Sequence, residues 1–199
     1  MIAIVLAAGY GTRLYPLTKD KPKPLLPVAR KPILNHILSK VEELDRRQLY
    51  GFDKIYLVTN NKFHQQFVEW LRKYQGQLKE VIEIINDNTN SDSERLGAVG
   101  DINFVVEKKS IDDDVFVIGG DNIFEFDLAR LIEMFENKAS SSVGLYDMKD
   151  KKLVQKKFGV VVLDKESRII EFQEKPSVPK STLASTACYL FTREDIRFL

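Results

Sequence analysis

The strongest constraint on the fold is an alternation of short apolar runs with longer segments of helical periodicity through the first 140 residues. Residues 2–6 form a continuous apolar run closed by Gly9, a pattern typical of a strand buried in a parallel sheet. From Pro32, a favourable first helical residue, apolar side chains recur at helical intervals along residues 33–44. The same alternation predicts strands at 54–59, 81–85 and 115–118 and helices at 63–74, 96–106 and 128–135. We therefore expect an α/β fold, a Rossmann-like, mostly parallel sheet with helices on both faces.

The pattern changes after residue 140, where strands follow one another with fewer helices between them. The predicted strands are residues 142–146, 159–163, 169–172 and 183–191. We interpret this stretch as a sheet edge plus a small β-rich, substrate-facing portion of a single domain that spans residues 1–199.

Charge and composition exclude several kinds of partner. Thirty lysines and arginines balance 29 acidic residues, so a net charge of +1 gives no general attraction to nucleic acid or anionic membranes. The first eight residues lack a basic leader, and no apolar run approaches the length of a membrane span. The single cysteine, Cys188, lies in an apolar run and is interpreted as a buried small hydrophobe. We expect a cytoplasmic protein without nucleic-acid or membrane partners.

The loop between the first strand and the first helix carries the clearest chemical signal. Four of its positions lack side-chain bulk: Ala7, Ala8, Gly9 and Gly11. Backbone N–H groups can therefore approach a phosphate chain closely, and ligands bind at the carboxyl ends of strands in open parallel sheets. Arg13 and Lys23 add positive charge, and four prolines between residues 16 and 27 restrict the loop.

Three other interpretations of this loop are weaker. A dinucleotide fingerprint needs a third glycine where Leu14 stands, and needs a helix at once where prolines intervene. A Walker-type loop needs the sequence Gly-Lys-Ser/Thr at the start of a helix, and this loop does not contain it. A purely structural glycine turn leaves the accompanying Arg13 and Lys23 without a role.

Residues 6–28, LAAGYGTRLYPLTKDKPKPLLPV, resemble the signature of the sugar-1-phosphate nucleotidyltransferases, which include glucose-1-phosphate thymidylyl- and uridylyltransferases. The resemblance implies that the loop wraps a nucleotide, that Arg13 grips the triphosphate and assists departure of pyrophosphate, and that Lys23 contacts the reacting phosphates. The nucleotide-binding residues that it implies are Leu6, Ala7, Ala8, Gly9, Gly11, Thr12, Arg13, Lys23 and Gly97.

Asp121 directly follows the predicted strand at residues 115–118, behind two glycines. An acid at the end of a parallel strand can face the cleft, and its hard oxygens suit Mg²⁺. Asp121 and Asn122 could instead form a turn. The resemblance implies a metal-binding aspartate, which completes a catalytic set of Arg13, Lys23 and Asp121 with Mg²⁺ as cofactor.

Four residues of the β-rich portion are implied to bind the sugar phosphate: Gly159, Glu174, Lys175 and Ser185. Glu174 would accept sugar hydroxyls and Lys175 would meet the phosphate. Taken alone, Gly159 could be a simple turn, and Glu174 with Lys175 an exposed ion pair. Ala187 stands where the family often has glycine.

Residues 86–102 are expected to read the base. The run Leu96-Gly97-Ala98-Val99-Gly100 resembles the family's base-binding element, with Gly97 as its anchor, but the glutamine of many thymidylyltransferases is not evident. His36 and His64 fall on predicted helices and lack a second ligand at metal spacing, and the acidic run 112–114 is interpreted as a solvated loop.

The expected activity is nucleotidyl transfer from a nucleoside triphosphate, with dTTP or UTP favoured, to a sugar 1-phosphate, here glucose 1-phosphate. Residues 1–140 would form the nucleotide-binding part and residues 141–199 the sugar-binding part. Family members continue beyond the position of Leu199, so we expect a continuation with a second metal-binding aspartate and a segment that makes the full-length protein a homo-oligomer. Without that aspartate, residues 1–199 alone are expected to bind nucleotide but to be weakly active or inactive. The alternatives are a non-catalytic scaffold domain of the same fold and an enzyme acting on a non-sugar phosphate.

Overall fold

The structure is a computed structural model that describes residues 1–47 and 50–199. The chain forms two compact units, the first comprising Met1–Ser142 with Tyr189–Leu199 and the second Val143–Cys188. The sequence-based division at residue 140 assigned residues 141–199 to the second part. Residues 189–199 belong instead to the first unit, because Ile196 is buried in its core beside Val115 and Val117.

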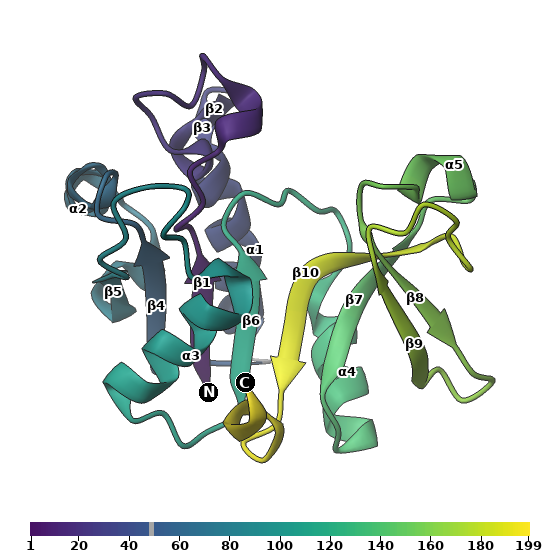
Figure 1. The fold of residues 1–199 in the computed structure, drawn as a ribbon. Helices are drawn as coiled ribbons and strands as arrows, with labels where there is room; N and C mark the ends of the chain where they lie inside the picture. Colours follow the sequence, from purple (N-terminus) through teal and green to yellow (C-terminus); the bar gives the residue numbers. More distant parts are fainter. Residues whose placement is uncertain (48–49) are drawn as a thin grey trace. The chain divides into compact units, whose positions relative to one another are not determined.

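The first unit is built on a parallel sheet (Figure 1). Its strands are β1 (Ile2–Leu6), β4 (Lys54–Thr59), β5 (Ile82–Asn86) and β6 (Val115–Gly119). They lie in the order β5-β4-β1-β6, each parallel to its neighbours, and β10 (Leu183–Phe191) follows β6. The direction in which the chain adds strands reverses between β1 and β6. In open α/β sheets this reversal marks the crevice in which ligands bind.

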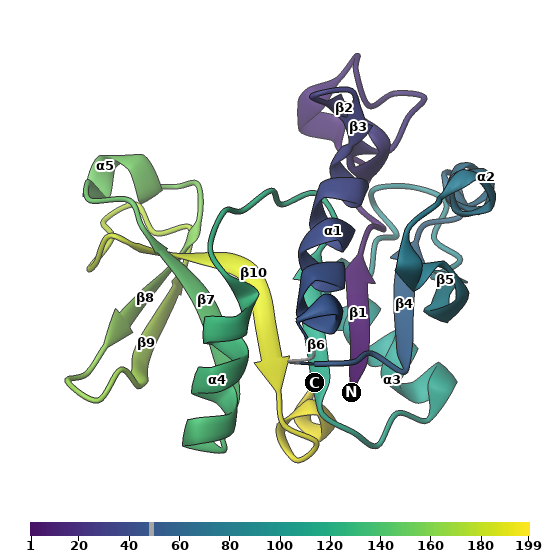
Figure 2. The same ribbon diagram turned by 180° about the vertical axis from the view of Figure 1, so that it is seen from behind.

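Helices cover both faces of this sheet (Figures 1 and 2). They are α1 (Ile33–Arg46), α2 (His64–Lys73), α3 (Gly97–Lys109) and α4 (Leu128–Lys138). Helix α3 packs on β1 and β4 from one side, while α1 lies on the other side and contacts α4. All six apolar residues on the predicted face of α1 are buried: Ile33, Leu34, Ile37, Leu38, Val41 and Leu44. The predicted α/β class is confirmed.

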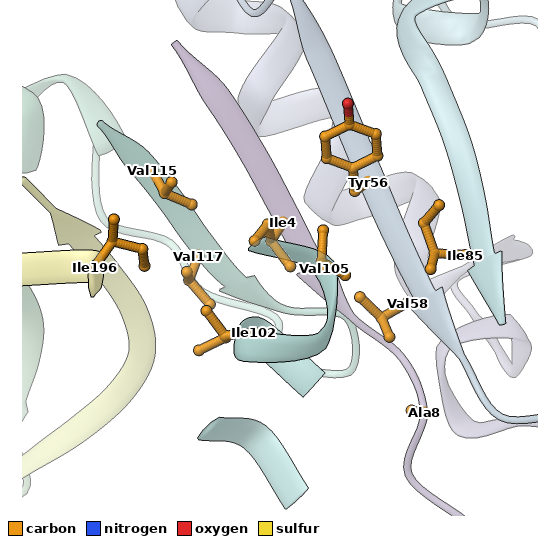
Figure 3. Close-up of a cluster of buried hydrophobic side chains, with 10 residues drawn as sticks. All are labelled: Ile4, Ala8, Tyr56, Val58, Ile85, Ile102, Val105, Val115, Val117 and Ile196. Atoms are coloured by element: carbon orange, nitrogen blue, oxygen red, sulfur yellow. The ribbon is translucent and has the colours of Figure 1, made fainter. Parts of the chain in front are cut away.

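The core beneath α3 explains why these strands are apolar along their whole length. Ile102 and Val105 of α3 pack against Ile4, Val58 and Val117, as Figure 3 shows. The alternate residues of the strands face the opposite layer and are buried too, as expected for a parallel sheet covered on both sides. Burial of one such side chain contributes roughly 1.5–3 kcal/mol.

The second unit is small and antiparallel, which confirms the predicted β-rich portion. Strand β8 (Gly159–Leu163) pairs with both β9 (Ile169–Glu174) and β10, and β7 (Ser142–Asp147) pairs with β10. Val154 of the short helix α5 (Lys151–Val154), Val160 and Ala184 form its core cluster. Cys188 is fully buried, and burial raises the pKa of its thiol to about 12, in agreement with an inert hydrophobe.

The remaining elements are short: η1 (Thr12–Leu14), η2 (Lys23–Leu25), β2 (Pro27–Val28), β3 (Lys31–Pro32), η3 (Gln77–Val81) and η4 (Asp195–Phe198). The acidic run 112–114 was expected to be a solvated loop, but its side chains bind residues near the C-terminal end of the sequence. Asp112 is paired with Arg193 and Arg197, and Asp114 Oδ1 accepts a 2.7 Å hydrogen bond from the Arg193 amide. Within residues 1–47 and 50–199, none of the helices combines the length and apolar character needed to cross a membrane.

Candidate active site

The glycine loop leaves the sheet at the end of β1, at the reversal of strand order. An added Cβ at Gly9 would meet no atom within 4 Å, so this position presents bare main chain to open space. Gly11 has a φ of +64°, a conformation that side chains rarely adopt, and its carbonyl accepts a 2.6 Å hydrogen bond from the Thr18 hydroxyl. The Thr18 hydrogen bond thus fixes the carbonyl of Gly11 within the loop.

Gly120 brings the end of β6 against the start of this loop. Its amide donates a 2.8 Å hydrogen bond to the carbonyl of Leu6, and an added Cβ would lie 2.8 Å from that same oxygen. Only glycine fits so close an approach between two strand ends. Asp121 follows directly and is therefore carried to the mouth of the loop.

Lys23 and Asp121 form an ion pair across the reversal point. Lys23 Nζ donates to Asp121 Oδ2 at 2.9 Å, with the two side chains 35% and 47% exposed. The pair joins residues 98 positions apart, and both remain accessible to a ligand. A cation and a carboxylate side by side beside bare main chain suit a polyphosphate and its counter-ion.

These groups share one cavity of about 220 Å³ in the first unit. Its lining is Leu6, Ala7, Ala8, Gly9, Gly11, Lys23, Pro24, Asp87, Arg95, Gly97, Ala98, Asp101 and Asp121. Eight of the residues predicted from the sequence are among them. A hollow of about 410 Å³ beside Trp70 and Tyr74 is larger but contains none of the predicted site residues.

Two predicted nucleotide-binding residues lie outside the cavity lining. Thr12 and Arg13 both belong to η1, and Arg13 is exposed. The Arg13 guanidinium makes no hydrogen bond or ion pair with the described residues. A contact with a bound triphosphate would require it to turn toward the cavity.

In the second unit, the predicted sugar-binding residues gather where β8 and β9 pair. Gly159 lies opposite Glu174 in the register, and Glu174 is ion-paired with Lys175. An added Cβ at Gly159 would lie 2.6 Å from the ring of Phe172, which is half exposed, so a larger residue would require that ring to move. Ser185 lies on β10. Ala187 has a φ of 52°, which explains why glycine suits this position.

A family model described as nucleotidyl transferase matches residues 2–199. The chain belongs to this family. The resemblance inferred from residues 6–28 is thereby confirmed.

Individual proteins that are similar to this chain carry different functional names. The chain is 38% identical over 194 residues to the bifunctional protein GlmU of Methanocaldococcus jannaschii, covering 98% of this chain and 40% of the relative. It is 30% identical over 205 residues to UTP–glucose-1-phosphate uridylyltransferase of Synechocystis, covering 100% of this chain and 51% of the relative. The chain thus spans about half or less of the length of these relatives.

A solved structure is similar over the whole chain. It is a Bacillus anthracis protein assigned as a glucose-1-phosphate thymidylyltransferase, determined in complex with a sucrose. The TM-score is 0.80 at 30% identity, and the match covers 100% of this chain and 74% of that one. The fold of the nucleotidyl transferase is therefore the one predicted.

Asp121 offers one accessible carboxylate, the type of oxygen ligand that Mg²⁺ takes in proteins. Mg²⁺ in phosphoryl-transfer sites keeps several waters and takes one or two carboxylates together with phosphate oxygens. In the part of the chain that the structure describes, no cluster of three or more His, Cys, Asp or Glu side chains could hold a metal. His36 bonds to the Val28 carbonyl and His64 to the Thr59 hydroxyl, as expected for residues with structural partners.

Two acidic residues of the cavity were missed by the sequence analysis. Asp87 follows β5 as Asp121 follows β6, so the rule applied to Asp121 would also have found it. Asp101 lies on α3 beside the buried Ile102, on a helix without a clear apolar stripe, so no local pattern marks it. They are 6% and 7% exposed, and each has one buried carboxyl oxygen without a hydrogen-bond partner.

Proposed function

We propose that this chain is the catalytic part of an enzyme that transfers a nucleotidyl group from a nucleoside triphosphate to a sugar 1-phosphate. The products are a nucleoside diphosphate sugar and pyrophosphate. The observation that carries the proposal is the Lys23–Asp121 pair beside the unobstructed main chain of Gly9, at the reversal point of a parallel sheet. This arrangement supports binding of a triphosphate with its divalent ion.

In the proposed reaction, a phosphate oxygen of the sugar 1-phosphate attacks the α-phosphorus in line with the leaving group. The new bond joins this oxygen to the α-phosphorus, and the bond between the α-phosphorus and the bridging oxygen of pyrophosphate breaks. The protein's contribution is positioning and charge neutralisation. Lys23 would hold the α-phosphate, and Arg13 would turn in to stabilise the departing pyrophosphate.

Magnesium, when bound, would neutralise charge on the phosphates, and Asp121 would be its ligand from this chain. The sugar phosphate would be held by the second unit. Glu174 would accept hydrogen bonds from sugar hydroxyls, Lys175 would orient the nucleophilic phosphate, and Gly159 and Ser185 would complete the contacts.

We further propose dTTP or UTP as the nucleotide and glucose 1-phosphate as the acceptor. Two proteins similar to this chain, the Synechocystis and Bacillus anthracis ones, are named for glucose 1-phosphate and for a uridylyl or thymidylyl group. A guanylyltransferase of Mycobacterium tuberculosis, 32% identical over 198 residues, is named for mannose 1-phosphate. The assay must therefore include GTP and mannose 1-phosphate.

The test combines binding with turnover. Thermal unfolding with Mg²⁺ and each of UTP, dTTP, GTP, CTP and ATP is followed by measurement of pyrophosphate release with glucose 1-phosphate or mannose 1-phosphate. We expect UTP or dTTP to raise the Tm, because a ligand that binds only the folded protein stabilises it. Failure of every triphosphate to raise the Tm would overturn the proposal and favour the scaffold interpretation.

Arg13→Ala tests the role assigned to the exposed arginine. We expect pyrophosphate release to fall by about a hundredfold, since the lost contact would act mainly in the transition state. Unfolding without ligand should be unchanged, because the guanidinium has no partner in the described residues. Arg30→Ala is a matched control at another exposed arginine, and normal turnover by the Arg13 variant would remove this residue from the mechanism.

A further inference from the structure

Asp87 and Asp101 form a buried acidic pair in the cavity wall. Asp87 Oδ2 and Asp101 Oδ1 are both buried and without a hydrogen-bond partner. Neither carboxyl has an ion pair with the described residues. Two carboxyl groups that interact in a dry site cannot both ionise readily, so one proton between them is the stable arrangement.

The other contacts of the pair show which carboxyl keeps the negative charge. Asp87 Oδ1 accepts hydrogen bonds from the Thr89 amide at 2.7 Å and from the Thr89 hydroxyl at 2.8 Å. Asp101 receives no such donor from the described residues, and burial, followed by the charge and hydrogen bond of Asp87, raises its pKa to about 7. Below that pH Asp101 is therefore the neutral member, and its proton would satisfy Asp87 Oδ2.

This pair is tied to the glycine loop. The Thr89 hydroxyl donates to Asp87, so its hydrogen bond with the Tyr10 hydroxyl, 3.1 Å long, has tyrosine as the donor. Tyr10 stands between Gly9 and Gly11 and is 4% exposed. The loop that would wrap the nucleotide and the acidic pair thus form one hydrogen-bonded network.

The pair lies away from the groups suited to phosphate. Asp87 follows β5 and Asp121 follows β6, and β4 and β1 lie between these strands. Three strand spacings separate them by about 14 Å, enough to place a base at one end of a nucleotide and its phosphates at the other. Gly97 and Ala98, at the start of α3, line the cavity with Asp101 and carry amide groups without helical partners.

We propose that Asp101 is a base-reading residue of this cavity: a neutral carboxyl, held by Asp87, that accepts a hydrogen bond from the ring N–H of the nucleobase. The proposal rests on the function proposed above. With UTP or dTTP the donor would be N3–H, and the neighbouring base carbonyls would face the free amides at the start of α3. A neutral acid can serve here because its carbonyl oxygen accepts from the ring N–H without placing a full negative charge beside the base carbonyls that flank this group.

The proposal predicts a pH dependence of nucleotide binding. The charged groups that line the cavity with Asp101 are Lys23, Asp87, Arg95 and Asp121. Tyr56 belongs to the core cluster beneath α3, and Tyr10 is linked to Asp87 through the Thr89 hydroxyl. Binding would be unaffected while Asp101 keeps its proton and would weaken as the pH rises above about 7, where ionisation puts a second negative charge into the wall.

The experiment compares UTP with inorganic tripolyphosphate, which has no base, in the presence of Mg²⁺ from pH 6 to pH 9. For the wild type, affinity for UTP relative to tripolyphosphate should fall at least about tenfold between pH 7 and pH 9. Asp101→Ala should lose at least about tenfold in UTP affinity at pH 7 and keep its tripolyphosphate affinity. That retained affinity also reports a folded site.

Asp101→Asn separates the hydrogen bond from the titration. The carboxamide keeps an acceptor oxygen for the base and donates to Asp87, but it cannot ionise. The UTP affinity of this variant should stay within about threefold of the wild type at pH 7. It should not decrease when the pH is raised above 7. Glu107→Gln, an exposed acid on the same helix, is the control and should behave as wild type.

Different results would overturn the proposed function and the assignment of Asp101 to base reading. A wild type that binds neither UTP nor tripolyphosphate overturns the proposed function and this inference with it. A wild type that binds both, with Asp101→Ala retaining full UTP affinity or losing equal affinity for both ligands, overturns the assignment of Asp101 alone.

Discussion

Asp121 and Asp87 each follow a buried parallel strand and line the same cavity, yet their surroundings are opposite. Asp121 is 47% exposed and paired with Lys23 at 2.9 Å. Asp87 is 6% exposed, forms no ion pair with the described residues and lies against a second carboxyl. An acid at a strand end is therefore not one kind of site: exposure beside Lys23 leaves the Asp121 carboxylate accessible to a ligand, whereas Asp87 is buried against a second carboxyl.

Asp121→Asn should have the largest effect of the changes that test this contrast. We expect kcat/KM for pyrophosphate release to fall about 10²–10³-fold, because the amide is a poor substitute for the proposed Mg²⁺ ligand. Stability in urea should be nearly unchanged, since exposed ion pairs contribute at most about 1 kcal/mol. Glu125→Gln, an exposed acid nearby in sequence, should retain activity; equal losses in both variants would contradict the role of Asp121.

Asp101→Asn should instead stabilise the protein at alkaline pH. The pKa of Asp101 is raised from 3.8 to about 7 in the folded protein, so folding must keep or take up a proton between these values. The unfolding free energy of the wild type therefore decreases as the pH rises from 3.8 to about 7, and Asp101 causes no further decrease above that pH. At pH 8 the variant should gain roughly 1–4 kcal/mol in unfolding free energy, with a smaller gain at pH 5.

Urea unfolding at the two pH values measures this difference. Asp121→Asn serves as the comparison, because Asp121 is half exposed and its replacement should show no such gain. A destabilised Asp101→Asn protein at pH 8 would contradict the shared proton.

Gly120→Ala and Gly9→Ala compare a glycine that is needed for close packing of two strand ends with a glycine that faces open space. The alanine methyl at position 120 would clash with the Leu6 carbonyl at 2.8 Å, so we expect a loss of roughly 1–3 kcal/mol in unfolding free energy. At position 9 the methyl meets nothing, so the fold should be unaffected while triphosphate binding weakens. Urea unfolding together with UTP binding separates the two outcomes, and equal stability of both variants would show that the close strand approach is not required.

Thr89→Val should have the smallest effect. It removes the 2.8 Å hydroxyl hydrogen bond to Asp87 and leaves the Tyr10 hydroxyl without its acceptor. We expect a loss of about 1–2 kcal/mol in unfolding free energy, restored by Thr89→Ser. Pyrophosphate release at saturating substrate should be unchanged, because Thr89 is not expected to contact the phosphates; an unchanged stability would show that the network contributes nothing to folding.

The sequence analysis predicted most of the elements and part of the site. The apolar run at residues 2–6 and the helical face that begins at Ile33 are local patterns, and both were found as predicted. Asp121 and Lys23 were selected separately, one from its place after a strand and the other from the family signature. Nothing local indicated that they form an ion pair, since 98 positions separate them.

The burial of Asp101 and its contact with Asp87 could not be predicted from the sequence. Its neighbours on α3 follow no clear apolar stripe, and an aspartate there could equally have been a surface residue. Only the packing of α3 on β1 and β4 buries it, and only the strand order brings Asp87 to it.

By itself, the sequence determined the strand–helix alternation, the open glycine loop and the family, because each depends on residues close together along the chain. The tertiary structure decided which charges meet and which lose their water. Those outcomes depend on strand order and burial, and a carboxyl group's proton affinity is set by its solvent and neighbouring charges and not by its place in the sequence.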